Sequence, residues 1–270
     1  MTTTVDSPAL SGTSPTPPRE NASAAARSPT HERLRGECVL LIGGTGGIGS
    51  AIAEALLREG VAEVIAAAPP SSAPRKFPAG AESELVDVTD LESVRALAAR
   101  LAHRNVGVVI NCAGVNGNCR LFSPGFERTA RREMDVNYYG LLNVAQVFGP
   151  TLKARGRGAL AVLLSFVSHV NLPAMATYSA SKAAAHSLLQ AFRAELAGAG
   201  VLVCGIYPTA VDTSMSRDFA GPKLSPADLA EAVIRALKDG LEDVYPGPAA
   251  AAYASLLNDP KGLERAMAAG

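Results

Sequence analysis

Residues 38–60 read CVLLIGGTGGIGSAIAEALLREG, and this stretch decides the fold class. CVLLI is a short, continuous apolar run of the kind that forms a buried strand. GGTGGIG follows as a glycine-rich turn, and SAIAEALLRE has the apolar spacing of an amphipathic helix that stops at Gly60. We therefore predict a strand, a tight turn and a helix in succession, which is the opening unit of a parallel α/β fold.

The same alternation continues through the rest of the chain. The further apolar runs that we predict as strands are VAEVIAAA (61–68), ELVDV (84–88), VGVVI (106–110), ALAVLL (159–164) and VLVCGIY (201–207), with DVYPG (243–247) as an edge strand. Helical patterns lie between them at 91–104, 126–154, 178–199 and 225–239. Parallel strands need helical crossovers and are covered on both faces. The sequence thus predicts a Rossmann-like, doubly wound parallel sheet with helices on both faces, and ligands at the carboxyl ends of its strands.

Composition limits the classes of function. The 270 residues are 48% apolar and 19% charged, so the chain can build a large core. The formal net charge of zero argues against nucleic acid or an anionic membrane surface as partner. No run reaches the ~18 apolar residues of a membrane span, and the start has no leader pattern. Four Cys without CxxC spacing and four scattered His argue against a metal site. We expect a soluble, cytoplasmic protein.

The chain divides into an arm and one domain. Residues 1–35 are rich in Ser, Thr, Pro and Ala with almost no large apolar side chain, so this segment cannot offset the entropy of ordering. We predict that 1–35 is a disordered arm and that 36–270 forms a single domain. No second domain and no internal repeat is visible after the predicted sheet.

The glycine-rich turn is the first candidate for a binding site. Glycines allow the backbone to approach a pyrophosphate closely while the N–H groups at the start of the next helix point at it. A tight turn that binds no ligand is the plainer interpretation of the same residues. The turn is not a phosphate-binding P-loop, because Ser50 stands where that motif requires Lys.

A second candidate is the pair Tyr178 and Lys182, which are four residues apart on one predicted helix face, shortly after a strand run that leads to Ser165. A Tyr hydroxyl with a pKa near 10 is a poor acid or base, but a nearby ammonium favours the phenolate. Lys182 can supply that charge. In isolation, such a pair is more often a surface coincidence, so the surrounding motifs decide its meaning.

Taken together, these motifs resemble those of the short-chain dehydrogenase/reductase family, in the family's order and over about residues 38–247. IGGTGGIG (42–49) stands for TGxxxGIG with Ile42 in place of Thr, and NCAG (111–114) stands for NNAG with Cys112 in second place. PTAVDT (208–213) is similar to PGxVxT with Thr209 in place of Gly. Ser165 lies thirteen residues before Tyr178, and Asn137 falls at the position of the family's catalytic Asn.

The resemblance implies a catalytic set and a cofactor site. Tyr178 would exchange a proton with the substrate oxygen, Lys182 would lower its pKa and bind the ribose, Ser165 would hydrogen-bond the carbonyl, and Asn137 would hold a relay water. No metal is implied. The implied cofactor-binding residues are Gly43, Thr45, Gly46, Gly47, Ile48, Gly49, Asp87, Val88, Asn111, Ala113, Gly114, Tyr178, Lys182, Pro208, Val211 and Thr213. The resemblance also implies a homodimer or homotetramer.

The implied cofactor is NADP(H) rather than NAD(H). An acidic residue at the end of the second strand would select the free 2′-hydroxyl of NAD, and VIAAAPP (64–70) has none. Arg75 and Lys76 follow shortly afterwards and could meet a 2′-phosphate, although both could simply be solvated loop residues.

The expected activity is oxidoreduction of a small-to-medium carbonyl or alcohol. Pro173, Met175, Met215 and Phe219 flank the predicted site, so we expect a largely apolar substrate pocket. His169 lies near the same site and is interpreted first as a loop residue and second as a substrate contact. One alternative is a dinucleotide-binding sensor or scaffold without turnover. Another is a nucleotide-sugar epimerase or dehydratase, but such relatives carry a larger C-terminal substrate domain.

Overall fold

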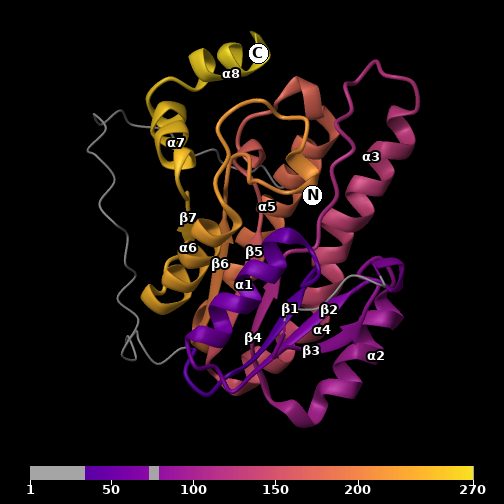
Figure 1. Cartoon of the computed structure of the whole chain (residues 1–270), viewed down its shortest axis with the longest axis vertical. Helices are drawn as coiled ribbons and strands as arrows, with labels where there is room; N and C mark the ends of the chain where they lie inside the picture. Colours follow the sequence, from indigo (N-terminus) through magenta and orange to yellow (C-terminus); the bar gives the residue numbers. More distant parts are fainter. Residues whose placement is uncertain (1–33, 73–78, 270) are drawn as a thin grey trace, which may run out of the picture.

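The computed structural model describes residues 34–72 and 79–269 (Figure 1). One sheet of seven strands lies at its centre, in the order β3-β2-β1-β4-β5-β6-β7, and every neighbouring pair is parallel. The strands are β1 Cys38–Ile42, β2 Glu63–Ala68, β3 Glu82–Leu85, β4 Val106–Asn111, β5 Gly158–Leu163, β6 Val201–Ile206 and β7 Asp243–Val244. The chain winds outward from β1 to β3, then returns to place β4 on the other side of β1. This reversal between β1 and β4 is the point at which doubly wound sheets bind ligands.

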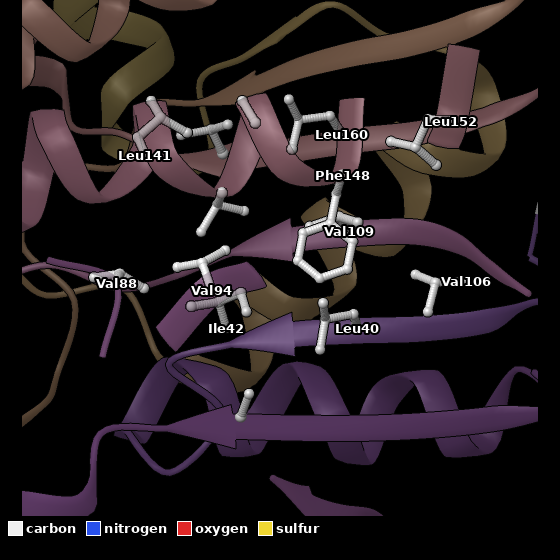
Figure 2. Packing of buried hydrophobic residues seen from close by; sticks show 14 of the residues in the cluster. Leu40, Ile42, Val88, Val94, Val106, Val109, Leu141, Phe148, Leu152 and Leu160 are labelled. Atoms are coloured by element: carbon white, nitrogen blue, oxygen red, sulfur yellow. The ribbon is translucent and has the colours of Figure 1, made fainter. Parts of the chain in front are cut away.

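Helices cover both faces of the sheet, as predicted. They are α1 Gly47–Arg58, α2 Leu91–Leu101, α3 Phe126–Met134, α4 Gly140–Arg155, α5 Ala176–Leu196, α6 Pro226–Asp239, α7 Pro248–Asn258 and α8 Pro260–Ala269. Leu40 and Ile42 of β1 join α2, α4 and α5 in one buried apolar cluster, part of which Figure 2 shows. Val39 and Leu41 point the other way and pack with α1 and α6. This alternation along a single strand gives the sheet two cores.

Three details differ from the sequence expectation. The predicted helix at 126–154 is divided by a π-helical turn at Asp135–Tyr139. The C-terminal helices α7 and α8, yellow in Figure 1, lie beyond the last predicted element. Leu34 was assigned to the arm, but its side chain is 2% exposed and packs in the cluster with α1 and α6. The packed domain therefore includes residue 34, two residues before the predicted boundary.

Some predictions concern residues that the structure does not describe. Residues 1–33 of the predicted arm lie outside them, as do Arg75 and Lys76. The four cysteines are free. In the two described ranges, no helix combines the length and the apolarity that crossing a membrane requires.

A cluster of two imidazole and three phenol rings attaches α7 to the sheet. His169 follows the turn after β5, His186 lies on α5, Tyr207 follows β6, Tyr245 follows β7, and Tyr253 lies on α7. His186 Nδ1 and the Tyr207 hydroxyl are 2.8 Å apart, and the Tyr245 hydroxyl is 3.2 Å from His169 Nε2. The Tyr245 and Tyr253 rings stack with centroids 3.8 Å apart. His169 thus lies in the loop after β5, as predicted, and its ring packs within this cluster.

This cluster makes stability depend on pH. Burial and the nearby His186 lower the pKa of His169 to about 4, against a smaller opposing effect of Asp243. Because the folded pKa is below the unfolded value of about 6.5, the unfolded chain binds more protons between these values. We therefore expect the free energy of unfolding to fall by about 1–2 kcal/mol as pH decreases from 6.5 to 4, a figure reduced for partial exposure of the ring.

Urea unfolding at pH 7, 6, 5 and 4 would measure this loss. His169→Phe should flatten the pH dependence, because it keeps an aromatic ring and removes the titrating group. The matched control is Tyr253→Phe, which removes a hydroxyl from the same cluster and leaves both imidazoles in place. If His169→Phe and Tyr253→Phe give parallel curves, His169 is not the responsible group.

Candidate active site

The glycine-rich turn after β1 lies against the turn after β4. Gly43 has φ +82°, and a Cβ added to it would lie 2.9 Å from the backbone N of Ala113. A Cβ on Gly49 would overlap the Gly43 carbonyl oxygen and lie 2.8 Å from Cα of Gly44. A side chain at Gly43 would therefore push these two turns apart, and one at Gly49 would push the start of α1 away from Gly43 and Gly44. Both turns lie at the switch point of the sheet, and there the backbone of one packs directly on the backbone of the other.

The start of α1 is open to an anion. Gly46 is the N-cap residue, and no side chain caps the helix. The backbone N–H groups of the first turn and the positive end of the helix dipole therefore suit a pyrophosphate. A Cβ on Gly47 would lie 3.2 Å from Cγ2 of Thr213, which belongs to the segment after β6. The structure thus brings the glycine-rich turn and Thr213 together, as one dinucleotide spanning both would require.

Other predicted cofactor residues lie in the loops after β3 and β4. Asp87 Oδ1 accepts hydrogen bonds from N and Oγ1 of Thr89, and Val88 is buried against Gly140. Asn111 Oδ1 accepts from the N of Ala113 at 3.3 Å. The side chains of Asp87 and Asn111 therefore form hydrogen bonds that stabilise the loops after β3 and β4.

The segment after β6 is held in the same way. Pro208 accepts a hydrogen bond from the N of Phe166 at 2.8 Å, next to Ser165. Val211 pairs with Leu224 in an isolated bridge. The two ends of the segment 208–213 are thus fixed, which holds Thr213 beside the start of α1.

Tyr178 and Lys182 are buried on α5, and Lys182 Nζ lies 5.8 Å from the centre of the Tyr178 ring. The ammonium donates a 2.8 Å hydrogen bond to the carbonyl oxygen of Leu163 at the end of β5. Ser165 follows two residues later, is also buried, and lies close enough to Tyr178 to act on its pKa. The anchoring of α5 to β5 therefore brings Ser165, Tyr178 and Lys182 into one buried group.

Burial controls the ionisation of this group. It raises the pKa of Tyr178 to about 12, with the Ser165 hydrogen bond acting in the opposite direction and the Glu133 carboxylate adding to the rise. Burial also lowers the pKa of Lys182 to about 8. From the sequence, Lys182 was expected to lower the pKa of Tyr178. Removing the phenol from water has the larger effect, because the charged phenolate loses its hydration.

Asn137 lies in the π-helical turn, and its side chain holds the loop after β4. Oδ1 accepts from the N of Val115, and Nδ2 donates to the O of Val115, both at 2.9 Å. Nδ2 also donates to Ser181 Oγ at 2.9 Å. Both polar atoms of the Asn137 side chain therefore help to join the loop to α5, and the second lone pair of Oδ1 stays available to a further donor.

Two residues of this site were not predicted from the sequence. Ser181 is buried beside Lys182, and Glu133 is buried one helical turn before Asn137. Glu133 Oε1 accepts from the N of Gly117 at 2.8 Å, whereas Oε2 has no hydrogen-bond partner among the described residues. A carboxylate four residues before Asn137 on one helix face was the available signal for Glu133. Ser181 gave no signal beyond its place between Tyr178 and Lys182.

The described residues hold no group of three side chains suited to a metal ion. The side chains of Tyr178, Ser165, Asn137 and Lys182 provide a phenol, a hydroxyl, an amide and an ammonium at the same edge of the sheet as the uncapped start of α1. Such a set can orient a carbonyl and move a proton to or from its oxygen.

Comparisons with known proteins agree with this geometry. A family model described as short chain dehydrogenase matches residues 37–222. An uncharacterized oxidoreductase of Staphylococcus saprophyticus is 31% identical over 217 residues, which cover 76% of this chain and 92% of the relative. A galactitol 2-dehydrogenase (L-tagatose-forming) of Cereibacter sphaeroides is 36% identical over 193 residues, which cover 68% of this chain and 75% of the relative.

Among solved structures, a short chain dehydrogenase of Burkholderia cenocepacia in complex with NADP superposes with a TM-score of 0.81. It is 34% identical, and the match covers 87% of this chain and 98% of that one. A Burkholderia phymatum short chain dehydrogenase/reductase in complex with NAD has a TM-score of 0.74 at 24% identity, covering 86% and 96%. The second likeness supports the fold alone.

Proposed function

This chain belongs to the short-chain dehydrogenase family, and from that membership we propose that it transfers a hydride between NAD(P) and a carbonyl or alcohol, with Tyr178 as general acid and base. The observation that carries the proposal is the buried group of Ser165, Tyr178 and Lys182 beside the uncapped start of α1. When bound, the nicotinamide supplies or accepts the hydride. The protein must supply orientation, a proton and stabilisation of the charge on the substrate oxygen.

The raised pKa of Tyr178 suits the reduction of a carbonyl. The phenol keeps its proton at neutral pH and donates it to the substrate oxygen as negative charge develops there. Ser165 holds the same oxygen through its hydroxyl. Lys182 binds a ribose hydroxyl, and its ammonium returns the proton to the phenolate. In the reverse direction, the phenolate accepts the proton of the alcohol.

The cofactor site is built from the residues that match the family motifs. Thr45, Gly46, Gly47 and Ile48 form the start of α1 and hold the pyrophosphate. Pro208, Val211 and Thr213 hold the nicotinamide end. The glycine cradle supports this assignment, since side chains at Gly43 and Gly49 would displace backbone. At the other end of the proposed site, Asp87 and Val88 would hold the adenine, and Asn111, Ala113 and Gly114 would line the middle.

We propose NADP(H) as the preferred cofactor. β2 ends in Ala67 and Ala68, and the exposed Pro69 follows, so this strand end offers no carboxylate for a free 2′-hydroxyl. Arg75 is the proposed partner of a 2′-phosphate. The NADP complex of the Burkholderia cenocepacia relative supports the preference.

The substrate is a small-to-medium, largely apolar carbonyl or alcohol. Met215 and Phe219 follow Thr213 and are each 43% exposed, so they are available to cover a substrate. The galactitol 2-dehydrogenase relative adds polyols to the substrates that should be tested.

We also propose that the enzyme is a homodimer or homotetramer. A sensor without turnover is the less favoured function, because it gives no role to a buried Ser165, Tyr178 and Lys182.

Titration of the purified protein with NADPH and NADH by nicotinamide fluorescence, followed by absorbance assays with ketones, aldehydes, alcohols and galactitol, tests this proposal. We expect NADPH to bind about 10-fold more tightly than NADH, which is about 1.4 kcal/mol, and at least one substrate to turn over. Pro69→Asp should reverse the cofactor preference by placing a carboxylate at the end of β2. Binding without turnover would favour the sensor, and failure to bind either nucleotide would overturn both functions.

A further inference from the structure

Ser181 connects two parts of the proposed active site. It lies on α5 between Tyr178 and Lys182, and its side chain is completely buried. Its hydroxyl donates a 2.7 Å hydrogen bond to the carbonyl oxygen of Tyr178 and accepts a 2.9 Å hydrogen bond from Nδ2 of Asn137. One hydroxyl thus joins the helical turn that carries Tyr178 and Lys182 to the π-helical turn that carries Asn137.

The amide of Asn137 is held at every polar atom. Its two Nδ2 hydrogens serve the Val115 carbonyl and Ser181, and Oδ1 accepts from the N of Val115. Removing the Ser181 hydroxyl would leave one buried N–H of Asn137 unpaired. The amide would then rotate or shift to find another acceptor, and the hydrogen bonds to Val115 would change with it.

The segment after β4 carries this disturbance to the reacting groups. A Cβ added to Gly114 would lie 3.3 Å from Asn137 Oδ1 and 3.4 Å from Lys182 Nζ. Gly114 therefore lies beside both the amide of Asn137 and the ammonium of Lys182, and Val115 follows it in the chain. π-Helical turns depart from the regular helix ladder and are frequent at functional sites. Such a turn needs contacts from outside the helix to set its position.

We propose that Ser181 is a positioning residue, which acts through Asn137 to set the π-helical turn and the loop after β4 relative to the Tyr178–Lys182 pair. This role rests on the proposed function, since it concerns the proton transfer assigned to that pair. Loss of the hydroxyl should lower kcat, because the proton donor and its ammonium neighbour no longer share one geometry. The KM for the nicotinamide cofactor should change little, since the start of α1 is untouched.

The test compares Ser181→Ala with Ser179→Ala. Ser179 is also buried on α5, but its hydroxyl donates to Met175 O and accepts from the N of Leu172, away from Asn137. We expect Ser181→Ala to lower kcat by about 10-fold, which corresponds to loss of about 1.4 kcal/mol of transition-state stabilisation, and to displace the pH–rate profile. Ser179→Ala should stay within twofold of the native enzyme in kcat, and Ser181→Thr, which restores a hydroxyl, should recover most of the loss.

A double-mutant cycle with Asn137→Ser identifies the route of the effect. If Ser181 acts through Asn137, Ser181→Ala lowers kcat much less in the Asn137→Ser background than in the native one. Hydrogen exchange at the N–H of Val115 gives a readout that does not need activity, and Ser181→Ala should accelerate it. Additive effects on kcat, equal losses in Ser181→Ala and Ser179→Ala, or unchanged exchange at Val115 would each overturn the proposal.

The proposed function and the role of Ser181 fail in different ways. A native protein that binds NADPH and turns over nothing would contradict the proposed function and, with it, any role of Ser181 in proton transfer. If Val115 exchange were still faster in Ser181→Ala than in Ser179→Ala, the hydrogen-bonded link itself would be confirmed as structural. Turnover by the native enzyme, with equal kcat in Ser181→Ala, would contradict the role of Ser181 alone.

Discussion

Replacing Tyr178 by Phe is expected to lower kcat by about 10²–10⁴-fold, the contribution typical of a positioned general acid or base. Phe keeps the buried ring and removes the hydroxyl that is proposed to exchange the proton. Because the start of α1 and the segment near Thr213 are unchanged, the dissociation constant for NADPH should stay within about threefold, or ~0.7 kcal/mol.

Steady-state kinetics with a turned-over substrate, together with fluorescence titration of NADPH, would measure both quantities. Tyr139→Phe is the matched control: it also removes a phenol hydroxyl from the chain, but the Tyr139 side chain is half exposed on the π-helical turn. It should leave kcat unchanged. A Tyr178→Phe enzyme within tenfold of native kcat would remove Tyr178 from its proposed role.

Replacing Gly49 by Ala is expected to cost about 2–3 kcal/mol of the free energy of unfolding, the upper part of the range for an overpacked core site. The new Cβ would overlap the Gly43 carbonyl oxygen and press on Cα of Gly44, and neither backbone atom can rotate away. The same displacement opens the pyrophosphate cradle. We therefore expect NADPH affinity to fall by at least ~10-fold.

Gly46→Ala is the control, because it replaces a glycine of the same turn without creating the steric clash expected at Gly49. Gly46 has φ −74°, and its added Cβ would meet only the Gly43 carbonyl oxygen, at 3.4 Å. Urea unfolding should therefore show a stability close to native for Gly46→Ala and a clear loss for Gly49→Ala. Similar unfolding midpoints for the two variants would mean that the turn relaxes around the added methyl group.

Local patterns in the sequence were sufficient for most of the architecture. Apolar runs and helical periodicity predicted the parallel sheet, because burial on both faces requires continuous apolar strands with helices between them. The predicted edge strand is confirmed at Asp243–Val244. Helices α7 and α8 were not predicted, and the Ala-rich segment of α7 carries little apolar periodicity.

The sequence predicted which motif residues come together, but it did not predict the pKa of Tyr178. Gly43, Gly49, Thr213, Ser165, Tyr178 and Lys182 come together at the switch point, as the order of the strands requires. The rise in the pKa of Tyr178 was not predicted, because it depends on how completely the folded chain excludes water from the phenol.

The sequence by itself determined the strand and helix order, the glycine-rich turn and the spacing of Tyr178 and Lys182, since each depends on neighbours within a few residues. The tertiary structure alone decided the π-helical turn, the joining of Asn137 to α5 through Ser181, and the packing of His169 among tyrosines. These features depend on partners that are tens of residues away in the chain. Burial and hydrogen bonding between such partners exist only after the sheet and helices have packed, so no local pattern encodes them.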